Sequence, residues 1–146
     1  MITTSSIEID APAVTVWEVF SDVARWPEWT ASVTRLVGLD GPAVSVGRRF
    51  EIKQPRMPKL VWEVTEVTPG SAWTWVQRSP GGFTSARHEV IPAGGGRTLV
   101  RQELDQHGVV GAVLARVMRR MTRRYLQMEA EGLTARTERR VDGPTA

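Results

Sequence analysis

Two histidines are present in this chain, and an imidazole is the side chain whose ordinary pKa lies nearest to neutral pH. His88 lies in the middle of an alternating segment, whereas His107 precedes a glycine and is expected to belong to a turn. We expect His88 to be a hydrogen-bonded side chain of the interior, with general acid or base catalysis as the alternative. Gln102, which shares the parity of Val100 and Leu104, is a second candidate that would orient a carbonyl or hydroxyl group of a ligand.

No further motif points to a catalytic residue, so the sequence leaves the catalytic residues unidentified. The chain has no cysteine, and its histidines have no partner at the spacing of a metal site. Three consecutive glycines at 94–96 separate two alternating segments, which indicates a hairpin turn and not a phosphate-binding loop. We expect no metal ion, no cofactor, and no second titratable side chain facing inward near His88.

The longest apolar pattern of the chain runs over residues 109–138 and would position part of any site. Its apolar residues recur at i, i+3, i+4 and i+7, which predicts one amphipathic helix with an apolar stripe of about five turns. The stripe consists of Val110, Val113, Leu114, Val117, Met118, Met121, Tyr125 and Met128. Because most of the preceding chain has the pattern of strands, we expect this helix to lie on one face of a sheet.

Seven segments alternate apolar and polar residues, as half-buried strands do. They are residues 3–9, 32–39, 47–54, 60–67, 72–78, 83–91 and 97–105. Short connections rich in Gly and Pro separate most successive strands, which favours antiparallel neighbours. Asp10 and Pro12 signal a helix start and Pro27 a stop, so two short helices should follow the first strand. The predicted fold class is therefore α+β.

Arginines dominate the charge of this chain, but the net charge is only +3. This balance argues against a nucleic-acid binder. One dense cluster, in the range 116–124, comprises Arg116, Arg119, Arg120, Arg123 and Arg124 on or beside the polar side of the predicted helix. We expect a solvated helix face; contact with an anionic partner, such as the lipid head groups of a membrane, is the less favoured alternative.

The length of 146 residues suits one domain, which we expect over residues 1–140, with a short flexible tail over residues 141–146. The first residues have neither the basic nor the apolar region of a secretory signal, and no uncharged apolar run is long enough to cross a membrane. Together with the absence of cysteine, these features predict a cytoplasmic protein. The sequence leaves monomer and homodimer both open.

Five short segments form an ordered set of motifs along the chain. They are DAPAVTVW at 10–17, DVARWPEW at 22–29, VGRRF at 46–50, VTEVTPG at 64–70 and GRT at 96–98. Over residues 2–138 the chain resembles the START-like (SRPBCC) superfamily, and more closely its polyketide cyclase/dehydrase and lipid-transport group. The resemblance implies a helix-grip fold, in which a curved antiparallel sheet wraps a long C-terminal helix and leaves a deep apolar cavity between them.

We expect such a cavity to be lined by the apolar faces of the strands and of the long helix, with plain core packing as the alternative for each residue. Rigid indole rings and adaptable Met side chains would suit a flat or greasy ligand. The expected ligand-binding residues are Trp29, Phe50, Ile52, Trp62, Val64, Trp73, Trp75, His88, Val90, Gln102, Leu114, Val117, Met121 and Tyr125.

Three functions are consistent with this sequence. The favoured one is a carrier or sensor that binds a small hydrophobic molecule, which the resemblance implies to be polyketide-, lipid- or quinone-like. The first alternative is an enzyme of the polyketide cyclase or dehydratase type that uses the same cavity. The second is a module that docks a protein or a membrane. Two or more titratable groups facing inward would favour the enzyme, and a filled interior would favour the docking module.

Overall fold

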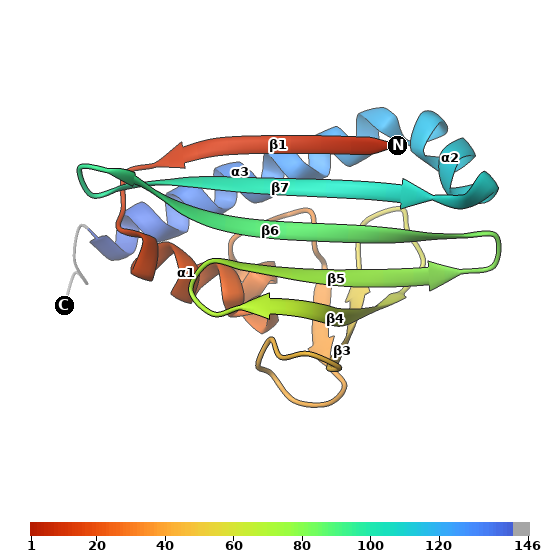
Figure 1. Ribbon diagram of the computed structural model, residues 1–146, viewed down its shortest axis with the longest axis horizontal. Helices are drawn as coiled ribbons and strands as arrows, with labels where there is room; N and C mark the ends of the chain where they lie inside the picture. The colour runs from red at the N-terminus through yellow and green to blue at the C-terminus, as the bar shows by residue number, and fades with distance from the viewer. Residues whose placement is uncertain (142–146) are drawn as a thin grey trace.

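Seven strands form one antiparallel sheet in this computed structural model, which describes residues 1–141 (Figure 1). The strands are β1 (Ile2–Ile9), β2 (Arg35–Gly38), β3 (Arg49–Lys53), β4 (Leu60–Thr68), β5 (Ala72–Ser79), β6 (Gly82–Gly94) and β7 (Arg97–His107). Strands β2 to β7 follow one another as a meander, and β1 pairs with β7 at the far edge. The predicted seven-stranded antiparallel sheet is confirmed.

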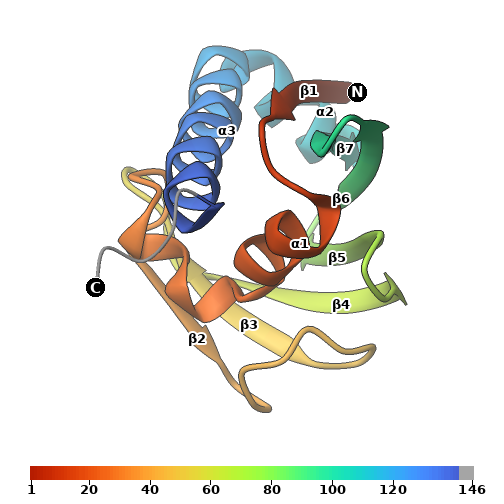
Figure 2. The same cartoon turned by 90° about the vertical axis from the view of Figure 1, so that its left-hand side faces the viewer.

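The sheet is strongly curved, and its concave side faces the helices (Figure 2). Two interruptions of the strand register, between Val64 and Glu66 and between Pro92 and Gly94, bend the strands locally, as bulges do. Helices α1 (Ala13–Ser21) and η1 (Val23–Glu28) follow β1 and close one end of the concave side. The helix starts directly after Pro12, as predicted, and the fold is α+β with the helix-grip arrangement.

The long helix predicted over residues 109–138 is divided into two helices. Helix α2 (Gly108–Val117) is followed by the cap residue Met118, after which helix α3 (Arg119–Val141) runs in a new direction. The backbone of Met118 is at φ −97° and ψ 12°, outside regular helical values, although its N–H still donates to the carbonyl of Leu114 at 2.8 Å. The apolar spacing is the same on both sides of this break, so periodicity alone predicted one helix.

Helix α3 also presents a different face to the sheet from the predicted one. Its buried side chains are Leu126, Glu129, Ala130, Leu133 and Thr137, whereas Met121, Tyr125 and Met128 of the predicted stripe are only half-buried. Gly132 allows this face of α3 to lie close to the end of η1. A Cβ atom at that position would lie 1.9 Å from the carbonyl oxygen of Trp29, so only glycine permits this approach.

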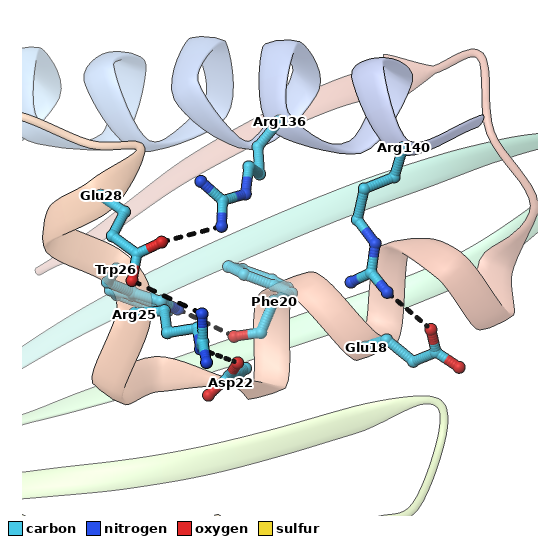
Figure 3. Close-up of polar contacts among 8 residues, drawn as sticks. All are labelled: Glu18, Phe20, Asp22, Arg25, Trp26, Glu28, Arg136 and Arg140. Atoms are coloured by element: carbon cyan, nitrogen blue, oxygen red, sulfur yellow. Dashed lines mark hydrogen bonds and ion pairs between the residues drawn. The ribbon is translucent and has the colours of Figure 1, made fainter. Parts of the chain in front are cut away.

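The interior is filled by aromatic side chains at the α1 end of the sheet. Trp73 is fully buried and packs edge-on against Phe20, with the ring centres 4.9 Å apart. Phe20 in turn stacks on Trp26, whose indole N–H donates to the Phe20 carbonyl at 2.8 Å (Figure 3). These large rings leave no room for a ligand at this end, so an open volume is expected further along the sheet.

Ion pairs fasten the C-terminal half of α3 to α1 and η1 (Figure 3). Arg136 contacts Glu28 at 2.8 Å, and Arg140 contacts Glu18 at 3.6 Å. Val141 is the last residue of α3, and the rest of the predicted tail, residues 142–146, lies outside the described residues. None of the helices within residues 1–141 combines the length and the apolar character that a membrane span requires.

Candidate ligand-binding site

A cavity of about 500 Å³ lies between the concave face of the sheet and helices α2 and α3. The lining contributed by β6 includes the small side chains of Thr84 and Ala86. The apolar part of the lining consists of Trp26, Val33, Ile52, Met57, Pro58, Leu60, Trp62, Trp75, Ala86, Leu104, Leu114, Met118 and Leu126. The cavity is therefore an apolar chamber beyond the packed aromatic end of the core.

The cavity reaches the surface between the loop that joins β3 to β4 and the junction of α2 with α3. Its exposed lining residues include Arg56 and Pro58 on the loop and Leu114 on α2. The Tyr125 hydroxyl on α3 donates a hydrogen bond to the carbonyl of Pro55 and so holds the loop against the helix. Arg56 has a φ of 63°, a conformation that non-glycine residues rarely adopt and that often occurs at functional sites.

One carboxyl group, that of Glu129, is buried in the wall of this cavity. The Ser32 hydroxyl donates to Glu129 Oε1 at 3.1 Å, and Ser32 itself lies 2.9 Å from the hydroxyl of Thr30. Burial raises the pKa of Glu129 from its ordinary value of 4.5 to about 7, while hydrogen bonds from Ser32 and Gln102 oppose the shift. At neutral pH this carboxyl group is present in both its protonated and its ionised forms, as a general acid or base requires.

His88 is also buried, in a box of aromatic rings. Its imidazole stacks on Trp73 with the ring centres 4.2 Å apart, and the edges of Phe20 and Trp75 enclose it. Nδ1 lies 3.4 Å from the carbonyl oxygen of Trp73. Burial lowers the pKa of His88 to about 3, so the ring is neutral at physiological pH. It can form hydrogen bonds with a ligand but does not supply a proton as an imidazolium.

The polar groups of the cavity converge from two strands and one helix. His88 on β6 and Gln102 on β7 are directly opposite one another in the sheet, and the Gln102 side chain reaches the Glu129 carboxyl group on α3. Within residues 1–141, no group of three or more His, Asp or Glu side chains could hold a metal ion. The arrangement suits the binding of a carbonyl or hydroxyl group at one end of a mainly apolar molecule.

The structure divides the expected ligand-binding residues into two groups. Those that line the cavity are Ile52, Trp62, Trp75, His88, Gln102, Leu114 and Tyr125. Those outside its lining are Trp29, Phe50, Val64, Trp73, Val90, Val117 and Met121. Phe50, Val64, Trp73 and Val90 are buried in the packed core.

The other three residues outside the lining lie in or next to helices, and the course of these helices places them away from the cavity. Trp29 lies at a separate surface groove near Arg25 and Arg136. Val117 is 77% exposed because it ends α2, before the chain changes direction. Met121 is half-buried because α3 turns Leu126, and not the predicted stripe, toward the sheet.

Glu129 is the functional candidate that the sequence analysis missed, and it corrects the expectation of no second inward titratable group near His88. A signal for it is present in the sequence. Leu126 and Leu133 lie three residues before and four residues after Glu129, and Ala130 follows it, so all four belong to one helical face. The predicted stripe passes through Tyr125 and Met128 instead, each one residue before the buried Leu126 and Glu129.

Comparison with known proteins agrees with this geometry. No curated protein sequence matches the chain. The Zhui aromatase/cyclase from Streptomyces sp. R1128 has a similar structure, with a TM-score of 0.82, 14% identity, and coverage of 100% of this chain and 98% of that one. Norcoclaurine synthase from Thalictrum flavum gives a TM-score of 0.75 at 11% identity, covering 97% of this chain and 96% of that one.

A START superfamily protein from Mycobacterium smegmatis has a TM-score of 0.73 at 16% identity, with coverage of 92% of this chain and 97% of that one. At these identities the similarity concerns the fold alone. Residues 2–138 match the family described as "Polyketide cyclase / dehydrase and lipid transport", which is nearly the whole chain. The chain belongs to the polyketide cyclase/dehydrase and lipid transport family.

Proposed function

We propose that the protein binds a small, mainly apolar molecule that carries at least one carbonyl or hydroxyl group. The observation that carries this proposal is the apolar cavity of about 500 Å³ with one buried carboxyl group in its wall. Cavities of roughly 300 to 1,000 Å³ with a few convergent polar groups are typical of small-molecule sites. The polar end of the ligand contacts Glu129 and Gln102, and its apolar body lies along the sheet toward the opening.

The lining favours a planar, unsaturated ligand. Trp26, Trp62 and Trp75 come from η1, β4 and β5, and each contributes to the cavity wall. Aromatic faces and edges interact favourably with other flat rings, and Met118 and Met57 adapt to an irregular outline. A polyketide- or quinone-like compound meets these demands, and a carrier or sensor role follows from binding alone.

Replacing Ala86 by phenylalanine should block the site. Ala86 lies on β6 between Trp75 and Leu104 of the neighbouring strands and lines the cavity. The added ring enters open space, so the fold should remain within about 1 to 2 kcal/mol of wild type. Affinity for phenylnaphthylamine, an uncharged apolar fluorescent probe, should fall at least about 100-fold, which corresponds to about 2.7 kcal/mol. Fluorescence titration measures this affinity.

The matched control is Ser85→Phe, on the same strand but on the opposite face of the sheet. This variant should bind the probe as wild type does. Equal probe affinity in folded Ala86→Phe and in wild type would show that apolar molecules bind elsewhere on the protein and would refute the proposed site.

A second candidate function, a dehydratase or cyclase that transfers protons, is favoured by the pKa of Glu129. In loss of water from a β-hydroxy ketone, the ionised carboxylate takes the proton from the carbon next to the carbonyl group. As the carbon–carbon double bond forms and the carbon–oxygen bond breaks, the same carboxyl group gives that proton to the departing hydroxyl, which leaves as water. Gln102 orients the ketone oxygen, and His88 remains neutral throughout.

Glu129→Gln should distinguish the enzyme from the carrier. With an aryl β-hydroxy ketone as substrate, turnover should fall at least about 100-fold, since general acid–base catalysis contributes on the order of 10² to 10⁴. Probe affinity should stay within about tenfold of wild type, the size of one hydrogen bond. His88→Phe should retain both binding and turnover within the same limit. Loss of turnover in His88→Phe alone, or no turnover by wild type, would contradict this second function.

A further inference from the structure

Helix α2 exposes an unusual number of large apolar side chains. Val109, Val113 and Val117 are 81%, 58% and 77% exposed, and Val110 and Leu114 are about half exposed. Val109, Val113 and Val117 are spaced by four residues and therefore lie along one side of the helix. A contiguous apolar surface of this kind usually marks a site of interaction with another molecule or with a membrane.

The chain segment that carries this surface is strongly positive. Residues 108–128 contain five arginines and no aspartate or glutamate. All five, from Arg116 to Arg124, are exposed, and none forms an ion pair with another residue of the described range 1–141. Arg136 and Arg140, further along α3, instead pair with carboxylates of the same chain (Figure 3). The cluster is thus available to an external anion.

The location of α2 relates this surface to the cavity. The helix lies at the end of the sheet opposite α1, beside the start of β6 and the end of β7 (Figure 1). Its attachment there includes a hydrogen bond from the Val110 N–H to the Gly81 carbonyl at 3.2 Å. Leu114 and Met118 line the cavity, so the exposed apolar side of α2 adjoins the route into the interior.

We propose that α2 and the first turns of α3 form a docking surface for an anionic lipid bilayer. The valines of α2 enter the head-group region, and the arginines that follow contact lipid phosphates, as in interfacial amphipathic helices. A second copy of the chain fits less well, because its five arginines would lie against the same five. An acidic protein would neutralise the arginines but offers no general match for a convex aliphatic surface. A bilayer satisfies both features, whatever ligand the cavity holds.

Co-sedimentation of the full chain with lipid vesicles tests this proposal. We expect binding to vesicles of phosphatidylcholine mixed with phosphatidylglycerol, weak binding to phosphatidylcholine alone, and release by added salt. Arg119→Ser combined with Arg123→Ser should weaken binding about fivefold for each arginine removed. Val113→Ser combined with Val117→Ser should weaken it at least about tenfold, because the apolar contribution is lost.

The matched controls lie outside the surface. Val14→Ser removes a valine that is 71% exposed on α1, and Arg139→Ser removes an exposed arginine at the far end of α3. Both should bind vesicles as wild type does. Absence of vesicle binding by folded wild type, equal binding to neutral vesicles, or binding only to an acidic protein would overturn the proposal. So would a wild-type dimer that Val113→Ser converts to a monomer.

Discussion

Replacement of Glu129 by glutamine should remove the contribution by which the stability of the fold decreases as the pH rises. Burial raises the pKa of this carboxyl group from 4.5 to about 7 in the folded chain. Between these values the folded chain binds more protons at Glu129 than the unfolded chain, so the free energy of unfolding falls as the pH rises. The full difference corresponds to about 3 kcal/mol. Glutamine keeps an oxygen to accept the Ser32 hydrogen bond and does not titrate.

Urea unfolding of wild type and Glu129→Gln at a series of pH values measures this effect. The variant should gain stability relative to wild type as the pH rises from 4.5 to 7, up to about 3 kcal/mol in total. Glu131→Gln, an exposed carboxyl group two residues away, is the control and should show no such gain. A difference between Glu129→Gln and wild type that stays constant with pH would mean that Glu129 ionises normally in the folded state.

His88 contributes a dependence of the opposite sign. Burial lowers its pKa from 6.5 to about 3, so in this window the unfolded chain binds the additional proton and stability is lost as the pH falls. In wild type the two effects oppose each other between pH 4.5 and 6.5. The stability of Glu129→Gln should therefore rise with pH through this window more steeply than that of wild type. Because the two contributions partly cancel, the pH dependence of wild-type stability alone would reveal neither the Glu129 nor the His88 contribution.

The sheet could be predicted from the sequence because one of its faces is buried. Alternation with a period of two then follows directly from the pleat, as Phe50 and Ile52 show on β3. On β6 the pattern is ambiguous, because both Val90 and Ile91 are apolar. The structure buries Val90, together with Ala86 and His88, and leaves Ile91 exposed. Which of the two residues is buried depends on which face of the sheet the helices cover, and the sequence of the strand alone does not determine that face.

The division of the long helix could not be predicted from the same kind of pattern. No proline or glycine lies next to Met118 in the sequence, and apolar residues recur at helical spacing on both sides of it. In the structure β7 extends to His107, two residues beyond the predicted end, and α2 packs where β6 begins at Gly82 and β7 ends, before α3 turns back across the sheet. This change of direction also determines which part of the stripe meets the cavity.

Leu133→Ala should destabilise the protein by about 3 kcal/mol, within the usual cost of a cavity left by a fully buried leucine. Leu133 is 0% exposed and belongs to the core beneath α3. It lies three residues after Ala130 and seven after Leu126, on the face that the structure turns inward. Its neighbour Gly132 brings this part of α3 against the backbone of Trp29, so the helix cannot shift inward to fill the space.

The control for this prediction is Met121→Ala, at a half-buried position of the stripe that the sequence pattern placed inward. Because much of the Met121 side chain already contacts water, its truncation should cost about 1 kcal/mol or less. Urea unfolding monitored by circular dichroism at one pH compares the two variants directly. If Met121→Ala were less stable than Leu133→Ala, α3 would be rotated so that the predicted stripe faces the sheet. Glu129 would then leave the cavity wall, and the raised pKa of its carboxyl group would be lost with its burial.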